Sequence, residues 1–242
     1  NMTPALRGFV KKHCKSSLVI CRNEPSRDVL GRMGIRTTGG ADTAWTFEPA
    51  PLPLGAEHLR RAGWDGKMPV LVVCPINPFW WPVKPDLAKA AAMRLVGQYR
   101  DEHYQSIYFH HSSQGATDKY ENYLDAIAQG VNHFASKRKC FPILVAMEQL
   151  DKYACEDLAP RLKTHLMPVG GAPIFASDVH DMFNMVSILR NCTWMLSSRF
   201  HAVVTSMPGQ VASAGITMDE RIRNLMNDRG HPQLFLEVDE AD

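Results

Sequence analysis

The sequence predicts an α/β protein built on a parallel, doubly wound β-sheet. Short apolar runs typical of buried strands alternate with segments of helical periodicity over about 160 residues. The chain has 242 residues, of which 45% are hydrophobic and 21% are charged, so it can bury a substantial core. Ligands of such sheets bind at the carboxyl ends of the strands. Residues that follow predicted strands are therefore the first candidates for a functional site.

The first predicted elements lie near the N-terminus. Residues 17–22, SLVICR, form a short apolar run that indicates a strand. Residues 26–34 predict a helix, with Ser26 as its N-cap and Gly34 just beyond its last turn. Residues 48–55, EPAPLPLG, are rich in proline and indicate a linker.

Strands and helices then alternate through the rest of the chain. The predicted strands are apolar runs of five to nine residues, at 68–76, 106–111, 141–147, 193–197 and 210–215. The predicted helices lie between them or after them, at 84–103, 120–138, 150–159, 179–192, 200–207 and 217–228. Thr217 and Glu220 stand at the spacing of a capping box at the start of the last helix.

Charge and cysteine content exclude several classes of protein. The 27 Lys and Arg against 25 Asp and Glu give a net charge of +2, which is too balanced for a nucleic-acid-binding surface, so any anion site must be local. No apolar run approaches the 18 residues of a membrane span, and the first residues lack the apolar core of a signal peptide. Six cysteines without a CxxC motif fit a reducing compartment. We therefore expect a location in the cytoplasm, including the inner face of a membrane.

The segment SSRFHAVVTSM, residues 197–207, places Arg199 and His201 between a predicted strand and a helix. Ser197 or Ser198 is expected to cap this helix, whose first N–H groups and positive dipole end attract an anion. The guanidinium of Arg199 fits a carboxylate or a phosphate, and the imidazole of His201 can accept or donate a proton. A purely structural alternative remains open, in which Arg199 pairs with a nearby acid and His201 packs in the core.

Two segments resemble the polysaccharide pyruvyl transferase family. One is SSRFHAVVTSM followed by QVASAGITMDERIRNLM, where the family has an S-R-x-H-A segment and, after a short strand, a helix carrying a basic residue. The other is LVICRNEPSRDVLGRMGIRTTGGADTAW, residues 18–45, which is similar to the family's strand, Arg, Ser, short helix and D-x-A segment. The resemblance covers most of this chain but only the later part of a typical member.

The resemblance implies a two-lobed, glycosyltransferase-B-like fold. Residues 1–50 would be the tail of the N-terminal lobe, and residues 56–242 a Rossmann-like C-terminal lobe. The implied reaction transfers pyruvate from phosphoenolpyruvate to two hydroxyls of a sugar as a ketal and releases phosphate. Its acceptor is a sugar of a polysaccharide or of a lipid- or nucleotide-linked precursor, and the chemistry requires no metal or cofactor.

The resemblance also implies a donor site. Arg22 and Arg199 would clamp the carboxylate and phosphate of phosphoenolpyruvate, and His201 would bind the phosphate or protonate the methylene carbon. The other candidate substrate-binding residues are Ser198, Arg221 and Asp42. Arg221 stands where the family more often has a Lys. Asp42 is either a base on the acceptor side or a turn residue beside two glycines.

Further polar and aromatic residues follow predicted strands. They are candidates for sugar binding or for packing and capping alone: Trp80, Trp81, His110, His111, Glu148 and Asp151. Two other functions remain open for the same architecture. One is a nucleotide-sugar glycosyltransferase or epimerase, and the other is an inactive, truncated lobe with a binding role.

Overall fold

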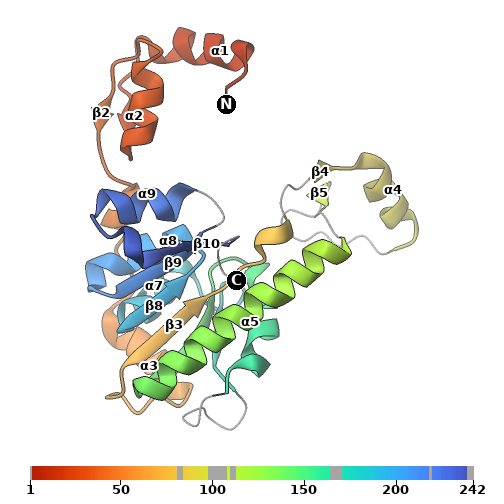
Figure 1. The fold of residues 1–242 in the computed structure, drawn as a ribbon, viewed down its shortest axis with the longest axis vertical. Helices are drawn as coiled ribbons and strands as arrows, with labels where there is room; N and C mark the ends of the chain where they lie inside the picture. Colours follow the sequence, from red (N-terminus) through yellow and green to blue (C-terminus); the bar gives the residue numbers. More distant parts are fainter. Residues whose placement is uncertain are drawn as a thin grey trace.

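A six-stranded parallel sheet is the centre of the structure (Figure 1). The computed structural model describes residues 2–80, 84–97, 108–109, 113–163, 171–217 and 220–238. Across the described part of the sheet the strands lie in the order β10-β9-β8-β3-β6-β7, and every neighbouring pair is parallel. Their bounds are β3 Val70–Cys74, β6 Phe141–Ala146, β7 Ile174–Ala176, β8 Trp194–Ser197, β9 Ala212–Thr217 and β10 Phe235–Glu237. The prediction of an α/β fold with a parallel, Rossmann-like sheet is confirmed at this level.

The strand order matches that of doubly wound dinucleotide-binding sheets. The first strand of the sheet along the chain, β3, lies at its centre, with β6 and β7 on one side and β8, β9 and β10 on the other. The order therefore reverses between β3 and β8, and crevices at such a switch point are where these folds bind ligands. Cys74 pairs with Ser197 at the carboxyl ends of these two strands.

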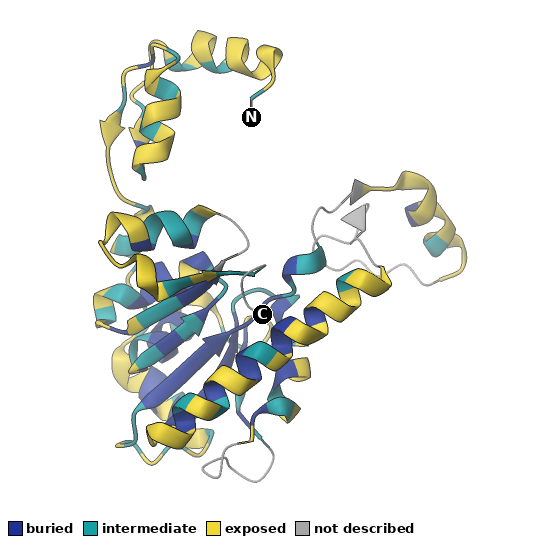
Figure 2. Ribbon diagram, viewed as in Figure 1, coloured by how far each residue is buried: buried dark blue, intermediate teal, exposed yellow. Residues whose placement is uncertain are grey.

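Helices cover both faces of the sheet. They are α3 Leu52–Arg61, α5 Gln114–Lys137, α6 Asp151–Leu158, α7 Met182–Arg190, α8 Phe200–Ser206 and α9 Glu220–Asp228. Val70 and Val72 of β3 pack with α3, α7, α8 and α9, whereas Leu71 and Val73 pack with α5 and α6. Successive residues of a strand face opposite sides, so the uninterrupted apolar sequence of β3 serves two cores, and the strand is buried throughout (Figure 2).

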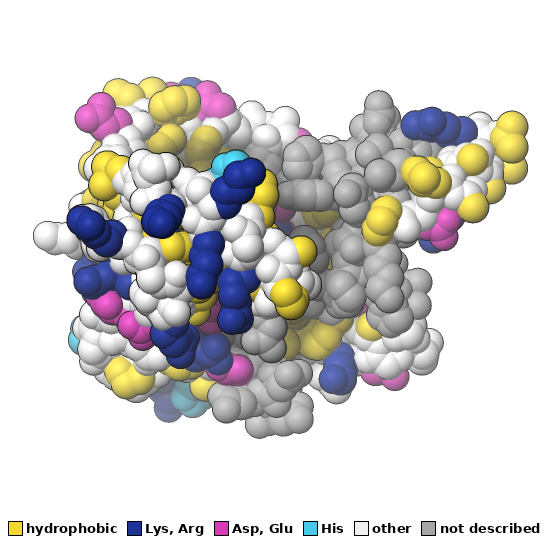
Figure 3. Space-filling model, turned by 90° about the horizontal axis from the view of Figure 1, so that it is seen from above, with side chains coloured by type: hydrophobic (Ala, Val, Ile, Leu, Met, Phe, Trp, Pro, Cys, Tyr) yellow, Lys and Arg dark blue, Asp and Glu magenta, His cyan; other side chains and the backbone are white. Residues whose placement is uncertain are grey.

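An extension formed by residues 2–39 stands away from the sheet (Figure 1). It contains α1 Pro4–Cys14, β1 Ile20–Cys21, α2 Glu24–Gly31 and β2 Thr38–Gly39, and β1 pairs with β2 in parallel. Neither helix has a buried residue, and most of the extension is exposed (Figure 2). The sequence between residues 2 and 36 has eight Lys or Arg but only two acidic residues. Lys and Arg side chains accordingly gather on this face of the molecule (Figure 3).

Several predicted boundaries are wrong. The helix expected at 84–103 is shorter, because α4 spans Leu87–Leu95 after β4 at Lys84–Pro85, and Gly97 follows with a positive φ of 67°. The helix α2 begins earlier than expected, with Asn23 rather than Ser26 as its N-cap. The proline-rich stretch expected as a linker contains the first turn of α3, where proline is well tolerated. The remaining short elements are β5 Tyr108–Phe109, η1 Thr43–Thr46, η2 Pro78–Trp80, η3 Ala159–Arg161, η4 Met207–Gly209 and η5 Pro232–Leu234.

The contact between α3 and α7 depends on Gly55. A Cβ atom at this position would lie 2.5 Å from the carbonyl carbon of Ser187 and 2.6 Å from its Oγ. Ser187 is fully buried, and its Oγ accepts a hydrogen bond of 3.1 Å from the N–H of Gly55. The two helix backbones therefore approach each other as closely as a glycine permits.

We expect Gly55→Ala to lower the free energy of unfolding by about 1–3 kcal/mol, because the added methyl group overpacks this contact. Chemical denaturation measures the change. Gly130→Ala is the matched control, since Gly130 lies in the helix α5 and a Cβ there meets nothing within 4 Å. The control should be neutral or stabilising by up to about 1 kcal/mol. Equal effects of the two substitutions would contradict the close approach.

Candidate functional site

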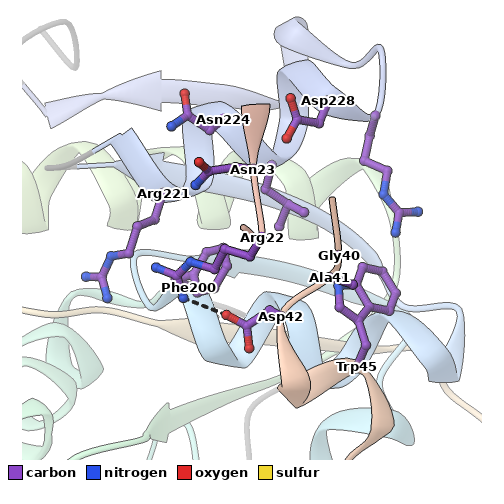
Figure 4. A pocket seen from close by; sticks show the side chains of 12 residues that line it. Arg22, Asn23, Gly40, Ala41, Asp42, Trp45, Phe200, Arg221, Asn224 and Asp228 are labelled. Atoms are coloured by element: carbon purple, nitrogen blue, oxygen red, sulfur yellow. Dashed lines mark hydrogen bonds and ion pairs between the residues drawn. The ribbon is translucent and has the colours of Figure 1, made fainter. Parts of the chain in front are cut away.

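A pocket of about 220 Å³ lies between the N-terminal segment and the helices α8 and α9 (Figure 4). Its lining comes from the segment that contains β1, β2 and η1, from the start of α8 and from one face of α9. The lining residues are Arg22, Asn23, Gly40, Ala41, Asp42, Trp45, Phe200, Arg221, Asn224, Leu225, Asp228 and Arg229. Two parts of the chain that are about 180 residues apart thus build one cavity.

Two arginines lie close to one aromatic ring in this pocket. The guanidinium carbon of Arg22 lies 5.1 Å from the ring centre of Phe200, and that of Arg221 lies 6.0 Å from the same ring. A guanidinium over an aromatic ring within about 6 Å is attracted by the negative face of the ring. Phe200 is 8% exposed, so it forms a fixed support for both cations. The structure therefore brings Arg22 and Arg221 to one small space.

Asp42 holds Arg22 in place. The Nη1 of Arg22 donates a hydrogen bond of 2.6 Å to Oδ2 of Asp42 (Figure 4), and the backbone N–H of Ala44 donates one of 3.0 Å to Oδ1. Burial alone would raise the pKa of Asp42, but these two hydrogen bonds and the charges of Arg22 and His201 together lower it below its ordinary value. A carboxylate in this state is a weak proton acceptor, so the geometry favours a positioning role over that of a base.

The local sequence explains why these residues meet. Arg22 directly follows β1, and the side chain of the next residue, Asn23, caps α2 by accepting a hydrogen bond of 3.0 Å from the N–H of Ser26. Gly40 follows β2, and its N–H donates to the carbonyl of Cys21 at 2.9 Å. A Cβ atom on Gly40 would lie 2.4 Å from the side chain of Ile20. The glycine therefore lets the two segments run side by side, with Asp42 two residues beyond it.

Arg199 lies in a different environment. Its Nε and Nη2 donate to the two carboxylate oxygens of Asp151 at 2.7 and 2.5 Å, and Nη2 also donates to Glu148 at 3.1 Å. Asp151 is only 2% exposed, and its burial raises its pKa, which the adjacent Arg199 partly offsets. Both acids follow β6, so the ion pair ties the start of α8 to the start of α6. The sequence-based alternative of a partner acid for Arg199 is thus present in the structure.

The two serines before Arg199 do not cap α8 as expected. The N-cap is Arg199 itself and makes no side-chain capping hydrogen bond. The Oγ of Ser197 accepts from the N–H of Arg199 at 2.9 Å, whereas the Oγ of Ser198 is 2.8 Å from the hydroxyl of Tyr123. Burial raises the pKa of Tyr123 to about 12, so this phenol stays protonated at neutral pH. Ser198 therefore faces the α5 side of the sheet edge.

His201 lies beside the pocket. The residue is exposed on the first turn of α8, and its ring meets that of Phe200 edge-on, at 5.3 Å between centres. Its charge contributes to the lowered pKa of Asp42, so the two side chains are within electrostatic reach. The imidazole is thus near the arginine cluster and open to solvent.

Arg221 was a candidate from the sequence, but Asn224 and Asp228 on the same face of α9, and Trp45 across the pocket, were not. Arg221, Asn224 and Asp228 recur at intervals of three and four residues, which places them on one side of the helix. Trp45 lies across the pocket, where the guanidinium carbon of Arg229 is 4.4 Å from the centre of its ring. The spacing on α9 was readable from the sequence, but the contact with Trp45 was not.

The remaining candidates lie elsewhere. Trp80 meets Tyr153 edge-on, with ring centres 6.5 Å apart. Trp81, His110 and His111 fall outside the described residues. Within the described part of the chain there is no group of three side chains suited to a metal ion. None of the described helices is both long and apolar enough to cross a bilayer.

Comparison with models of known protein families gives no match to this sequence. No curated protein and no solved structure matches it either. Fold and site alone therefore define the class: an α/β protein with a parallel, doubly wound sheet and an arginine-containing pocket close to the carboxyl ends of β8 and β9.

Proposed function

We propose that this chain carries the donor site of a pyruvyl transferase, which moves pyruvate from phosphoenolpyruvate to two sugar hydroxyls as a ketal. The observation that supports this function best is the convergence of Arg22 and Arg221 on the Phe200 ring within one pocket. Phosphoenolpyruvate carries a carboxylate and a phosphate close together. Two guanidinium groups around a small cavity suit such a compact, doubly anionic ligand.

Arg22 is well arranged for the donor. Its guanidinium has five N–H donors, and the hydrogen bond to Asp42 uses Nη1. The side chain is 41% exposed whereas that of Asp42 is 10% exposed, so the arginine reaches into the cavity from a fixed acidic anchor. Arg221 enters the same cavity from α9. Arg199 has a structural role in this proposal. Its Nε and Nη2 already donate to the carboxylate of Asp151, so it fixes the start of α8 instead of binding the donor.

His201 is proposed as the proton donor. A proton added to the methylene carbon of phosphoenolpyruvate gives an oxocarbenium-like C2, which a first sugar hydroxyl attacks. The C2–O bond to phosphate then breaks, and the second hydroxyl completes the ketal. One of the two hydroxyl protons replaces the proton used at the methylene carbon, and the other leaves with the phosphate. An exposed imidazole next to the arginines is suited to this exchange.

The two-lobed architecture is part of the same proposal. A glycosyltransferase-B-like protein has two Rossmann-like lobes, and residues 56–242 would be the C-terminal one. Residues 1–50 would be the tail of the other lobe, and they carry Arg22 and Asp42 to the pocket. The site would then be built where the two lobes meet.

A nucleotide-sugar enzyme of the same architecture is the main rival. The strand order of the sheet would suit a nucleotide as well. However, the turn after β3, PINPFW, contains no glycine. In dinucleotide-binding folds glycines in this turn let the backbone approach the pyrophosphate. This feature favours a small anion over a nucleotide diphosphate.

A phosphate-release assay with phosphoenolpyruvate and galactosyl, glucosyl and mannosyl acceptors tests the function. Acceptor-dependent release of phosphate, with a pyruvate ketal on the product by mass spectrometry, is the expected result. Binding of phosphoenolpyruvate without release would favour an inactive lobe. Release of a nucleotide diphosphate from a nucleotide sugar would favour the rival enzyme.

Arg22→Lys is expected to weaken binding of phosphoenolpyruvate about 10- to 100-fold, because a lysine keeps the charge but loses the planar fork. Isothermal titration calorimetry measures this affinity. Arg7→Lys is the control, since Arg7 lies on the exposed helix α1 of the same extension. Unchanged affinity in Arg22→Lys would remove Arg22 from the donor site.

A further inference from the structure

The two ends of the pocket differ in chemistry (Figure 4). Arg22, Arg221 and Phe200 form one end, where Asp42 is bonded to Arg22. This end attracts anions. Trp45 lies toward the other end, close to Arg229.

The Trp45 end combines an aromatic ring with both donors and acceptors. Asp228 supplies a carboxylate and Arg229 a guanidinium, and Asn224, between Arg221 and Asp228 on α9, supplies an amide; all three line the pocket. Within the described part of the chain no hydrogen bond is made by the side chain of Asn224 or Asp228. Arg229 instead lies over the ring of Trp45 at 4.4 Å. The side chains of Asn224 and Asp228 are therefore available to a ligand.

The charges at this end cancel. Asp228 and Arg229 carry opposite charges, and Asn224 is neutral. An anionic ligand would therefore gain little electrostatic attraction at this end. Sugar hydroxyls donate and accept hydrogen bonds at once, and a carboxylate, an amide and a guanidinium satisfy both functions. The C–H face of a pyranose also packs on an indole. A neutral, polyhydroxylated ring matches this set better than a phosphate or an apolar group.

We propose that the end of the pocket formed by Trp45, Asn224, Asp228 and Arg229 is the subsite for the acceptor sugar. The inference rests on the proposed function, since it places the acceptor beside the donor in one cavity. Asn224 and Asp228 then select the sugar by its hydroxyl pattern. Arg221 and Asn224, one turn apart on α9, mark the boundary between donor and acceptor.

The test uses the full chain with methyl glycosides of galactose, glucose and mannose as probes. Their dissociation constants are measured by NMR titration, and that of phosphoenolpyruvate by calorimetry. Asp228→Ala and Asn224→Ala are the variants, because Asp228 is exposed and Asn224 half-buried, whereas Trp45 packs against the core and its removal risks the fold. Asn227→Ala is the matched control: it is exposed on the same helix and does not line the pocket.

We expect at least one methyl glycoside to bind the wild type, and both variants to weaken it by about tenfold or more. Asn227→Ala should leave that affinity unchanged, and no variant should alter phosphoenolpyruvate binding more than about twofold. Glycoside binding that is equal in all four proteins overturns the subsite, as does the absence of glycoside binding to the wild type up to millimolar concentrations. If the wild type does not bind phosphoenolpyruvate, that result contradicts the proposed function and not the subsite.

Discussion

Arg199→Met is expected to lower the free energy of unfolding by about 3–5 kcal/mol, because it leaves the carboxylate of Asp151 buried without its partner. Asp151 is 2% exposed and receives two hydrogen bonds from the Arg199 guanidinium. Burial already raises the pKa of Asp151 above its ordinary 3.8, and removal of the cation raises it further. When the pKa of a carboxyl group is higher in the folded than in the unfolded state, the free energy of unfolding falls as the pH rises above 3.8. The loss should therefore be larger at pH 7 than near pH 4.

Arg161→Met is the matched control for this prediction. The side chains of Arg161 and Arg199 are both 24% exposed, but the partners of Arg161, Glu121 and Asp125, are 49% and 58% exposed. The control should cost only about 1–2 kcal/mol, mostly through its hydrogen bonds. The double variant Arg199→Met with Asp151→Asn should regain part of the loss. Urea denaturation at the two pH values measures each effect. Equal losses for Arg199→Met and Arg161→Met would show that burial of Asp151 does not add to the cost of removing its partner.

His201→Asn is expected to lower the maximal rate of pyruvyl transfer about 10²- to 10⁴-fold, because asparagine cannot exchange a proton at neutral pH. Affinity for phosphoenolpyruvate should change much less, since Arg22 and Arg221 hold the anionic groups in the proposed site. His201 is exposed, so the fold should be unaffected. Steady-state kinetics with phosphoenolpyruvate separates the rate from the Michaelis constant.

The exposed His231 offers the control, and His231→Asn should keep the wild-type rate. If His201 only binds phosphate, His201→Asn should raise the Michaelis constant for phosphoenolpyruvate while the maximal rate survives. A variant with both constants at the wild-type level would return His201 to a packing role beside Phe200.

Four strands of the sheet, β3, β6, β8 and β9, were predicted from the sequence, whereas β7 and β10 were not, and the clearest signals came from β3 and β6, which are apolar throughout. A strand such as β3 that packs helices on both faces has no polar alternation, and VLVVC shows this directly. The helices α1 and α3 were missed for a local reason. Each has proline at its first turn, which fits the helix start geometrically but reads as a turn signal in a sequence.

The candidate site was readable only in part. Arg22, Asp42 and Arg221 were candidates from the family resemblance, and the structure places all three in one pocket. The partner of Arg199 was not identifiable, because Asp151 precedes it by 48 residues and only the parallel pairing of β6, β3 and β8 brings their carboxyl ends together. Contacts across a sheet depend on strand order, which periodicity does not reveal.

The extension of residues 2–39 contributes Arg22 and Asn23 to the lining of the pocket, although its two helices have no buried residue. A ligand that touches both Arg22 and Arg221 therefore also fastens the extension to α9. Ligand affinity and attachment of the extension are thermodynamically linked, so each must strengthen the other by the same factor. A macromolecule that binds α1 or α2 and stabilises the attached position of the extension would consequently raise the affinity for the ligand without contacting the pocket. One that stabilises a detached position would lower this affinity.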